Sequence, residues 1–169
     1  MKKKILLAVF CISLSTLKAQ NTDNKPCSTE EAGQFDFWTG NWNLTYNDTV
    51  HATNRITKEM DGCVIYEHFD DPTQSFRGMS WSMYNSKQKK WQQTWVDNQG
   101  GYIVLTGGFE NNKMTLSTEP KKLADGKSVQ NRMIFYNISS NNFDWNWEST
   151  QDEGKTWSLK WKIHYDRMK

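Results

Sequence analysis

The chain has 169 residues, a length typical of one domain, and this excludes a multidomain enzyme. It contains nine Trp, eight Phe and six Tyr, and a chain that can bury so many rings is not expected to be disordered. The 21 basic and 19 acidic residues nearly balance, and no basic run beyond the first four residues favours a nucleic-acid partner.

The first 20 residues have the pattern of a secretory signal peptide. Lys2–Lys4 precede an apolar stretch from Ile5 to Leu17, and the small residue Ala19 stands at the expected cleavage site. The stretch is too short and too often interrupted by hydroxyl residues to form a stable membrane span. We therefore expect an exported protein, periplasmic or secreted. Cleavage of the leader would remove four lysines, which leaves 17 basic against 19 acidic residues and a net charge of −2 for the mature chain.

Two cysteines remain once the leader and its Cys11 are removed. In an oxidising compartment Cys27 and Cys63 can form a disulfide, which would contribute about 3–4 kcal/mol by closing the loop between them. The alternative is a buried, reduced Cys63 and a free thiol at Cys27. The sequence leaves both alternatives open.

Residues 21–34 are polar and contain Pro26, so we expect a flexible N-terminal segment before a single domain at 35–169. From Trp42 onward, apolar and polar residues alternate in short runs bounded by Asn, Asp and Gly, which is the period of β-strands. The expected strands lie at 42–46, 53–60, 63–69, 78–84, 91–95, 102–107, 113–118, 128–137, 143–147 and 157–165.

About ten strands joined by tight turns predict an all-β fold, an antiparallel up-and-down barrel that hides its edges by closing on itself. A sandwich is the alternative. In a barrel the apolar face of each strand points inward, so most of the tryptophans are expected to line one interior. From this parity, and from the few polar side chains expected among the rings, we predict a ligand-binding set made of Trp42, Trp81, Met83, Gln93, Trp95, Arg132, Trp145 and Trp161.

Residues 150–157, TQDEGKTW, match the Asp-box pattern of sialidase-like propellers. The motif occurs once in a chain too short for a propeller, so we interpret Asp152 as a turn former that accepts hydrogen bonds from the backbone, with Gly154 in the left-handed conformation.

The string FDFWTGNW at residues 35–42 resembles the opening of a widespread bacterial family of unknown function that is often described as lipocalin-like (calycin). Further elements of that pattern follow in order, at Gly78-Met79-Ser80, Trp91–Asp97, Arg132-Met133 and Tyr165-Asp166-Arg167. The resemblance implies a barrel related to lipocalins, fatty-acid-binding proteins and nitrobindins, which agrees with the strand count.

Nitrobindin-like barrels bind haem through a histidine on a late strand, and His164 stands on such a strand. Parity places His164 on the outer face and the glycine-rich signature of those proteins is missing, so no haem and no other cofactor is expected. No two of His51, His68 and His164 have metal-ligand spacing. Glu67 and His68 point to opposite faces of one strand and cannot act together on one substrate.

A catalytic set is not recognisable, and we predict Arg132 to be the structural charge partner of Asp36. The leading hypothesis is a barrel that binds a small apolar or aromatic ligand in a Trp- and Met-rich interior. The alternatives are side chains that simply fill the barrel, a cavity enzyme such as an isomerase, cyclase or hydrolase with Gln93, Tyr66 or Arg132 as its polar group, and carbohydrate recognition by exposed Trp.

Overall fold

The computed structural model describes residues 25–169, so the predicted signal peptide lies outside the described residues. The described chain is nearly all antiparallel β-sheet with three short 3-10 turns, η1 (Glu31–Gly33), η2 (Asp36–Trp38) and η3 (Met60–Gly62). The strands are β1 (Gly40–Tyr46), β2 (Thr49–Glu59), β3 (Val64–Asp71), β4 (Phe76–Asn85), β5 (Lys90–Asp97), β6 (Tyr102–Glu110), β7 (Lys113–Ser117), β8 (Lys121–Lys122), β9 (Ser128–Tyr136), β10 (Asn142–Thr150) and β11 (Ser158–Arg167).

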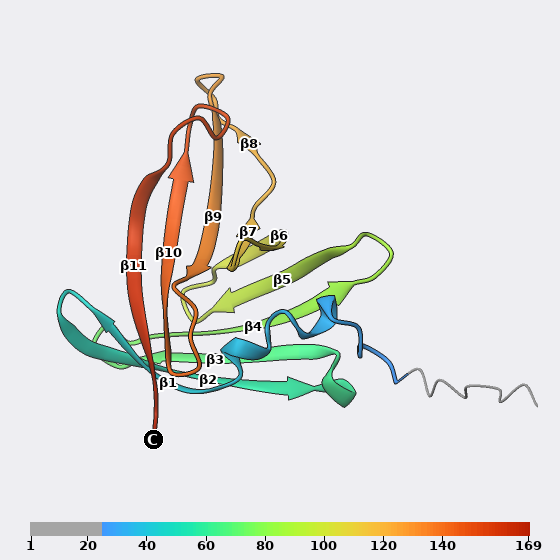
Figure 1. Cartoon of the computed structure of the whole chain (residues 1–169). Helices are drawn as coiled ribbons and strands as arrows, with labels where there is room; N and C mark the ends of the chain where they lie inside the picture. Colours follow the sequence, from blue (N-terminus) through green and yellow to red (C-terminus); the bar gives the residue numbers. More distant parts are fainter. Residues whose placement is uncertain (1–24) are drawn as a thin grey trace, which may run out of the picture.

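Ten of these strands form a closed up-and-down barrel, as the sequence predicts. Each pairs with its neighbours along the chain, and β11 pairs with β1 to close the wall. The short β8 is an extra strand that pairs only with β9. In Figure 1, β9, β10 and β11 stand upright while β2–β5 run across them, so the two halves of the wall cross at a steep angle.

Two hairpins show how local sequence sets the register. Asn47-Asp48 joins β1 to β2 and Asn111-Asn112 joins β6 to β7, and all four residues have positive φ. A two-residue turn with positive φ at both positions matches the right-handed twist of the strands, and Asn and Asp tolerate this conformation better than other non-glycine residues. These turns place Tyr46 opposite Thr49 and so direct the apolar face of β1 inward.

The N-terminal segment closes one end of the barrel, where β9 ends and β10 begins (Figure 1). Phe35 and Trp38 are fully buried there, and the ring of Phe35 packs edge-on against Trp91 and Phe135 with centroids 4.9 and 5.3 Å apart. Arg167 holds η2 in place, because its guanidinium donates to the carbonyl oxygens of Phe37 and Thr39 at 3.2 and 2.8 Å.

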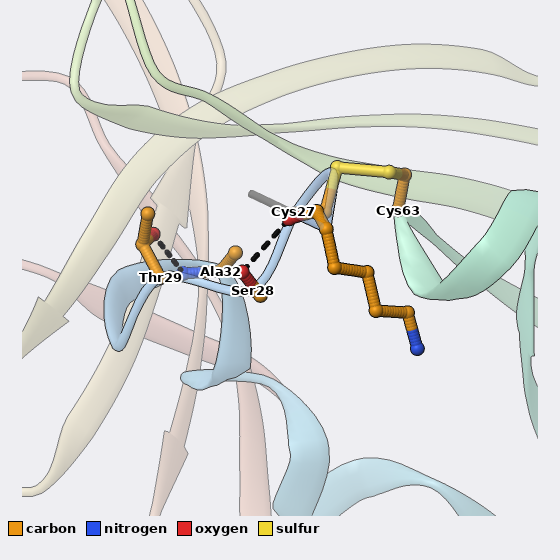
Figure 2. The surroundings of a disulfide bond; sticks show 6 residues. Cys27, Ser28, Thr29, Ala32 and Cys63 are labelled. Atoms are coloured by element: carbon orange, nitrogen blue, oxygen red, sulfur yellow. Dashed lines mark hydrogen bonds between the residues drawn. A yellow bond between two sulfur atoms is a disulfide. The ribbon is translucent and has the colours of Figure 1, made fainter. Parts of the chain in front are cut away.

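The segment before η1 is tied to the barrel by a disulfide between Cys27 and Cys63 (Figure 2). The bond spans 36 positions of the chain and connects this segment to the start of β3. Of the two alternatives left by the sequence, the structure contains the disulfide. The segment continues into η1, where the backbone N–H of Ala32 donates to Thr29 Oγ1 at 3.3 Å and Ala32 is buried.

Candidate functional site

The barrel interior contains an apolar cavity of about 220 Å³ at the end opposite the N-terminal segment, where β5 ends and β6 begins. It is lined by aromatic and aliphatic side chains with a single charged residue. The lining residues are Phe69, Phe76, Trp95, Asp97, Ile103, Leu105, Met133, Trp145, Trp147, Trp161 and Ile163. An apolar cavity of about 150 Å³ is known to admit benzene, so this one has room for a ligand of one or two rings.

The tryptophans of the cavity come from three strands. Trp145 and Trp147 stand on the inner face of β10, their rings nearly parallel with centroids 6.4 Å apart. Trp161 is the cross-strand partner of Trp147 on β11, and its ring lies at 90° to that of Trp145. A β-bulge lies beside Trp147 and Trp161, where β11 has one residue more than β10, and bulges often re-aim side chains next to functional sites.

The fourth tryptophan, Trp95, lies over a glycine of the neighbouring strand. A Cβ at Gly78 would stand 2.0 Å from Trp95 Cζ2, so only glycine leaves room for the indole ring in this position. The Trp95 indole N–H donates to Asp97 Oδ2 at 3.0 Å, so its one polar atom is satisfied at the edge of the cavity.

Asp97 is the charged residue of the cavity lining. Its Oδ1 accepts hydrogen bonds from the backbone N–H groups of Gln99 and Gly101 at 2.9 and 2.8 Å. Partial burial opposes ionisation, but these bonds and the one from Trp95 outweigh it and hold the pKa of Asp97 below its usual range. Gly101 is required beside the carboxylate, since a Cβ there would stand 2.0 Å from Asp97 Oδ2.

One layer deeper in the barrel lies a polar cluster, formed by Asn54, Glu67, Ser80, Gln93 and Tyr165. Glu67 accepts from Asn54 Nδ2 at 2.7 Å and from Ser80 Oγ at 2.5 Å, and Gln93 Nε2 donates to Ser80 Oγ at 3.0 Å. No Lys or Arg forms an ion pair with Glu67 among the described residues. Burial therefore raises the pKa of Glu67 to about 7, although the two hydrogen bonds offset part of the desolvation.

The polar cluster is not fully satisfied. Asn54 Oδ1 and Gln93 Oε1 are buried without a hydrogen-bond partner among the described residues. The hydroxyl of Ser82, the cross-strand neighbour of Gln93 on β4, is also buried without one. Glu67 and Gln93 precede the cavity residues Phe69 and Trp95 by two positions, so they face the same interior one layer further in. They do not belong to the cavity lining itself.

Of the eight predicted ligand-binding residues, Trp95, Trp145 and Trp161 line the cavity together. Gln93 is buried in the polar cluster instead. Trp42 is fully buried at the closed end, where its indole N–H donates to the Trp38 carbonyl at 2.7 Å.

The prediction that Trp81 and Met83 face the interior is wrong. Their side chains are 46% and 47% exposed on the outer wall of β4, and the ring of Trp81 packs beside Tyr66 there, with centroids 5.6 Å apart. The inner face of β4 carries the small residues Gly78, Ser80 and Ser82 instead. Small residues are needed there because Trp95 of the adjacent strand occupies the space above Gly78.

Arg132 also lies on the outer wall rather than in the interior. Its Nη2 forms an ion pair with Glu148 Oε2 at 2.6 Å, and its guanidinium stacks 3.9 Å from the ring centre of Trp157. The predicted pairing of Arg132 with Asp36 is wrong as well, because Asp36 pairs with Lys58 Nζ at 2.6 Å. The outward positions of Arg132 and Tyr66 exclude both from a cavity site in this conformation.

Several cavity residues were not assigned to the ligand-binding set from the sequence, chiefly Phe69, Phe76 and Asp97. Phe69 and Phe76 flank the β3–β4 turn. The inward direction of Phe69 follows from its alternation with Ile65 on β3, whereas Phe76 shares the inner face of β4 with Gly78 and Ser80. The sequence around Asp97 is typical of a turn, and only the folded structure shows that its carboxylate accepts a hydrogen bond from Trp95 at the cavity.

The remaining sequence motifs have structural roles. Asp152 accepts hydrogen bonds from the backbone N–H of Thr156 at 2.9 Å and from two hydroxyls, and this confirms its role as a turn former. These bonds lower the pKa of Asp152 to about 2. His164 lies on the outer face of β11, as parity predicts, with Nδ1 2.8 Å from Asp144 Oδ1.

Across residues 25–169, no three His, Cys, Asp or Glu side chains gather as a metal site would require. The same part of the chain has no helix that is long and apolar enough to cross a membrane. No family model and no curated protein matches the sequence.

Proposed function

We propose that the protein is an exported, lipocalin-like binding protein whose cavity takes a small apolar or aromatic ligand. The observation that carries this proposal is the cavity itself, a space of about 220 Å³ walled by four tryptophans and further apolar side chains. Binding sites for small molecules are typically concave and apolar, with a few placed polar groups, and Asp97 supplies the one charged group of this lining. A barrel filled by its own side chains would lack this space.

Toluene is a suitable probe, because it is slightly larger than benzene and has no polar group. We expect saturable binding in saturation-transfer NMR, with quenching of tryptophan fluorescence. Ile103→Trp should abolish both signals by filling the cavity that Ile103 lines. Val104→Trp is the matched control, since Val104 is the next residue on β6 and its side chain is 47% exposed on the outside. Equal binding of toluene to both variants would overturn the assignment of the cavity.

Export is part of the proposal. The basic and apolar leader supports it, and the Cys27–Cys63 disulfide supports it because such bonds persist in oxidising compartments. Expression of the full chain in a bacterial host should yield a periplasmic or extracellular product whose intact mass corresponds to a start at or next to residue 21. A cytoplasmic product that retains residues 1–20 would contradict export. The relation to the calycin-like family with the FDFWTGNW opening is likewise proposed, and the closed ten-strand barrel supports it.

A second candidate function, a cavity enzyme that moves a proton, is favoured by one observation. Glu67 has a pKa of about 7 and faces the interior beneath the cavity, so it holds a proton that can be exchanged near neutral pH. The base-sensitive substrate 5-nitrobenzisoxazole tests this, because removal of its ring C–H proton breaks the N–O bond and releases a coloured phenolate. Turnover that rises with pH through about 7 and is lost in Glu67→Gln would favour the enzyme. Absence of turnover would leave binding as the function.

A further inference from the structure

The lining of the cavity is mostly apolar, and the charge that it carries is negative. Among residues 25–169, Asp97 is the only charged side chain of the lining, and no Lys, Arg or His of this part of the chain belongs to it. The carboxylate is also the only strong hydrogen-bond acceptor that a side chain offers there, because the other lining residues are aromatic or aliphatic, with one methionine. The one charge of the lining is therefore negative, and the other polar side-chain atoms of the lining are the indole N–H donors of its tryptophans.

The aromatic walls are arranged as a box. The ring of Trp161 stands at 90° to Trp145 and at 78° to Phe69, with centroids 5.9 and 6.1 Å away. Phe69 in turn lies at 72° to Trp95, with centroids 6.0 Å apart. Rings at steep mutual angles around one space give a guest in that space contact with several ring faces and edges. The face of an aromatic ring carries negative potential and attracts a cation within about 6 Å.

Hydrogen bonds from neighbouring residues stabilise the charged form of Asp97. Its two oxygens accept hydrogen bonds from Trp95, Gln99 and Gly101, which leave the carboxylate with no need of a cationic side chain. Within residues 25–169, the carboxylate forms no ion pair with Lys, Arg or His. The negative charge at the edge of the cavity is thus not neutralised by a cationic side chain of the described residues.

We propose that the cavity recognises a small organic cation of the quaternary or tertiary ammonium class, held by the tryptophan box and balanced by Asp97. This inference rests on the proposed function of the cavity as a binding site and names the chemical class of its ligand. A primary ammonium has three N–H donors to satisfy, and the lining offers one carboxylate for them. A quaternary ammonium has no N–H donor and a tertiary ammonium has only one, which the carboxylate of Asp97 can accept; both are weakly hydrated and match the aromatic walls. Their size also suits a cavity of about 220 Å³.

The sharpest test compares choline with 3,3-dimethylbutan-1-ol, its neutral isostere, in which a carbon replaces the charged nitrogen. The two molecules have the same shape and the same hydroxyl, so their difference in affinity reports the charge. Binding to the mature protein is measured by calorimetry and by saturation-transfer NMR on the methyl protons. We expect choline to bind about tenfold more tightly than the neutral alcohol, or better.

Variants locate the source of this preference. Trp145→Leu replaces an aromatic wall by an aliphatic one, so it should weaken choline binding several-fold more than it weakens binding of the neutral alcohol. Trp81→Leu is the matched control on the outer face of β4, and it should change neither affinity. Asp97→Asn removes the charge with little change of shape and should reduce the preference for choline, while thermal unfolding verifies that the β5–β6 turn remains folded.

The outcomes separate this inference from the proposed function. Equal or tighter binding of the neutral alcohol, or binding of toluene without binding of choline, would overturn the ammonium assignment and leave the apolar binding site standing. If toluene, choline and the alcohol all fail to bind, both the inference and the proposed function are wrong. Choline binding that survives Trp145→Leu and Asp97→Asn unchanged would place the cation elsewhere and also overturn the inference.

Discussion

Replacement of Glu67 by Gln is expected to stabilise the protein above neutral pH and to leave it unchanged in acid. Glu67 is buried, and its pKa rises from the usual 4.5 to about 7, mainly because of desolvation. A group that binds its proton more tightly in the folded state stabilises that state only while it is protonated. The contribution of Glu67 to stability is therefore highest below pH 4.5, falls between pH 4.5 and 7, and stays low above pH 7.

The magnitude follows from the two pKa values. Each pH unit between 4.5 and 7 corresponds to 1.36 kcal/mol, so ionised Glu67 lowers the free energy of unfolding by about 3 kcal/mol above pH 7. Gln has the same shape and no charge. Its oxygen can accept from Asn54 and its amide can donate to Ser80, which reverses the direction of the Ser80 bond and supplies the donor that a protonated Glu67 also carries.

Urea unfolding of the wild type and of Glu67→Gln across pH 4 to 8 measures this effect. The difference between the two proteins cancels the titration of all other groups, provided that these are unperturbed by the substitution. We expect the difference to be near zero at pH 4 and to reach about 3 kcal/mol in favour of the variant at pH 8. A constant difference over the whole range would refute the reasoning, because it would mean that the pKa of Glu67 is the same in both states.

Two further predictions concern the Cys27–Cys63 disulfide and the packing around the cavity. Replacement of both Cys27 and Cys63 by Ser should lower the free energy of unfolding by about 3–4 kcal/mol, measured in urea; an unchanged midpoint would show that the disulfide does not constrain the unfolded chain. Gly78→Ala should destabilise the barrel by about 1–3 kcal/mol and weaken toluene binding, because its Cβ collides with Trp95. Gly108→Ala, which meets no atom within 4 Å, is the control and should be neutral or stabilising in the same thermal and binding assays.

The alternation of apolar and polar residues predicts correctly which side chains face the barrel interior on strands whose outer face carries charged residues. On β11 the residues Lys160 and Lys162 identify the outer face, so the inward direction of Trp161 and Ile163 is predicted correctly. The turns are also predictable from the local sequence, because Asn47-Asp48 favours a two-residue hairpin through its backbone preferences alone. These features depend on neighbours in the sequence and therefore can be read from it.

The same rule fails on β4, and the reason is volume. Neither face of residues 78–83 carries a charge, so hydrophobicity alone places Trp81 and Met83 inside. The interior at this height is already occupied by Trp95, which leaves no room even for a Cβ at Gly78. Whether the apolar face of a strand points inward thus depends on what the adjacent strand contributes, and that is a property of packing across the barrel.

The sequence by itself determined the all-β class, the approximate strands, the tight turns and the inward direction of Trp95, Trp145 and Trp161, because each follows from period and local conformational preference. The tertiary structure alone decided that these rings surround a space, that Asp97 is the charge at its edge and that Glu67 lies buried beneath it. Cavity volume, desolvation and the partners of a charge all arise from residues distant in the chain, so no local pattern encodes them.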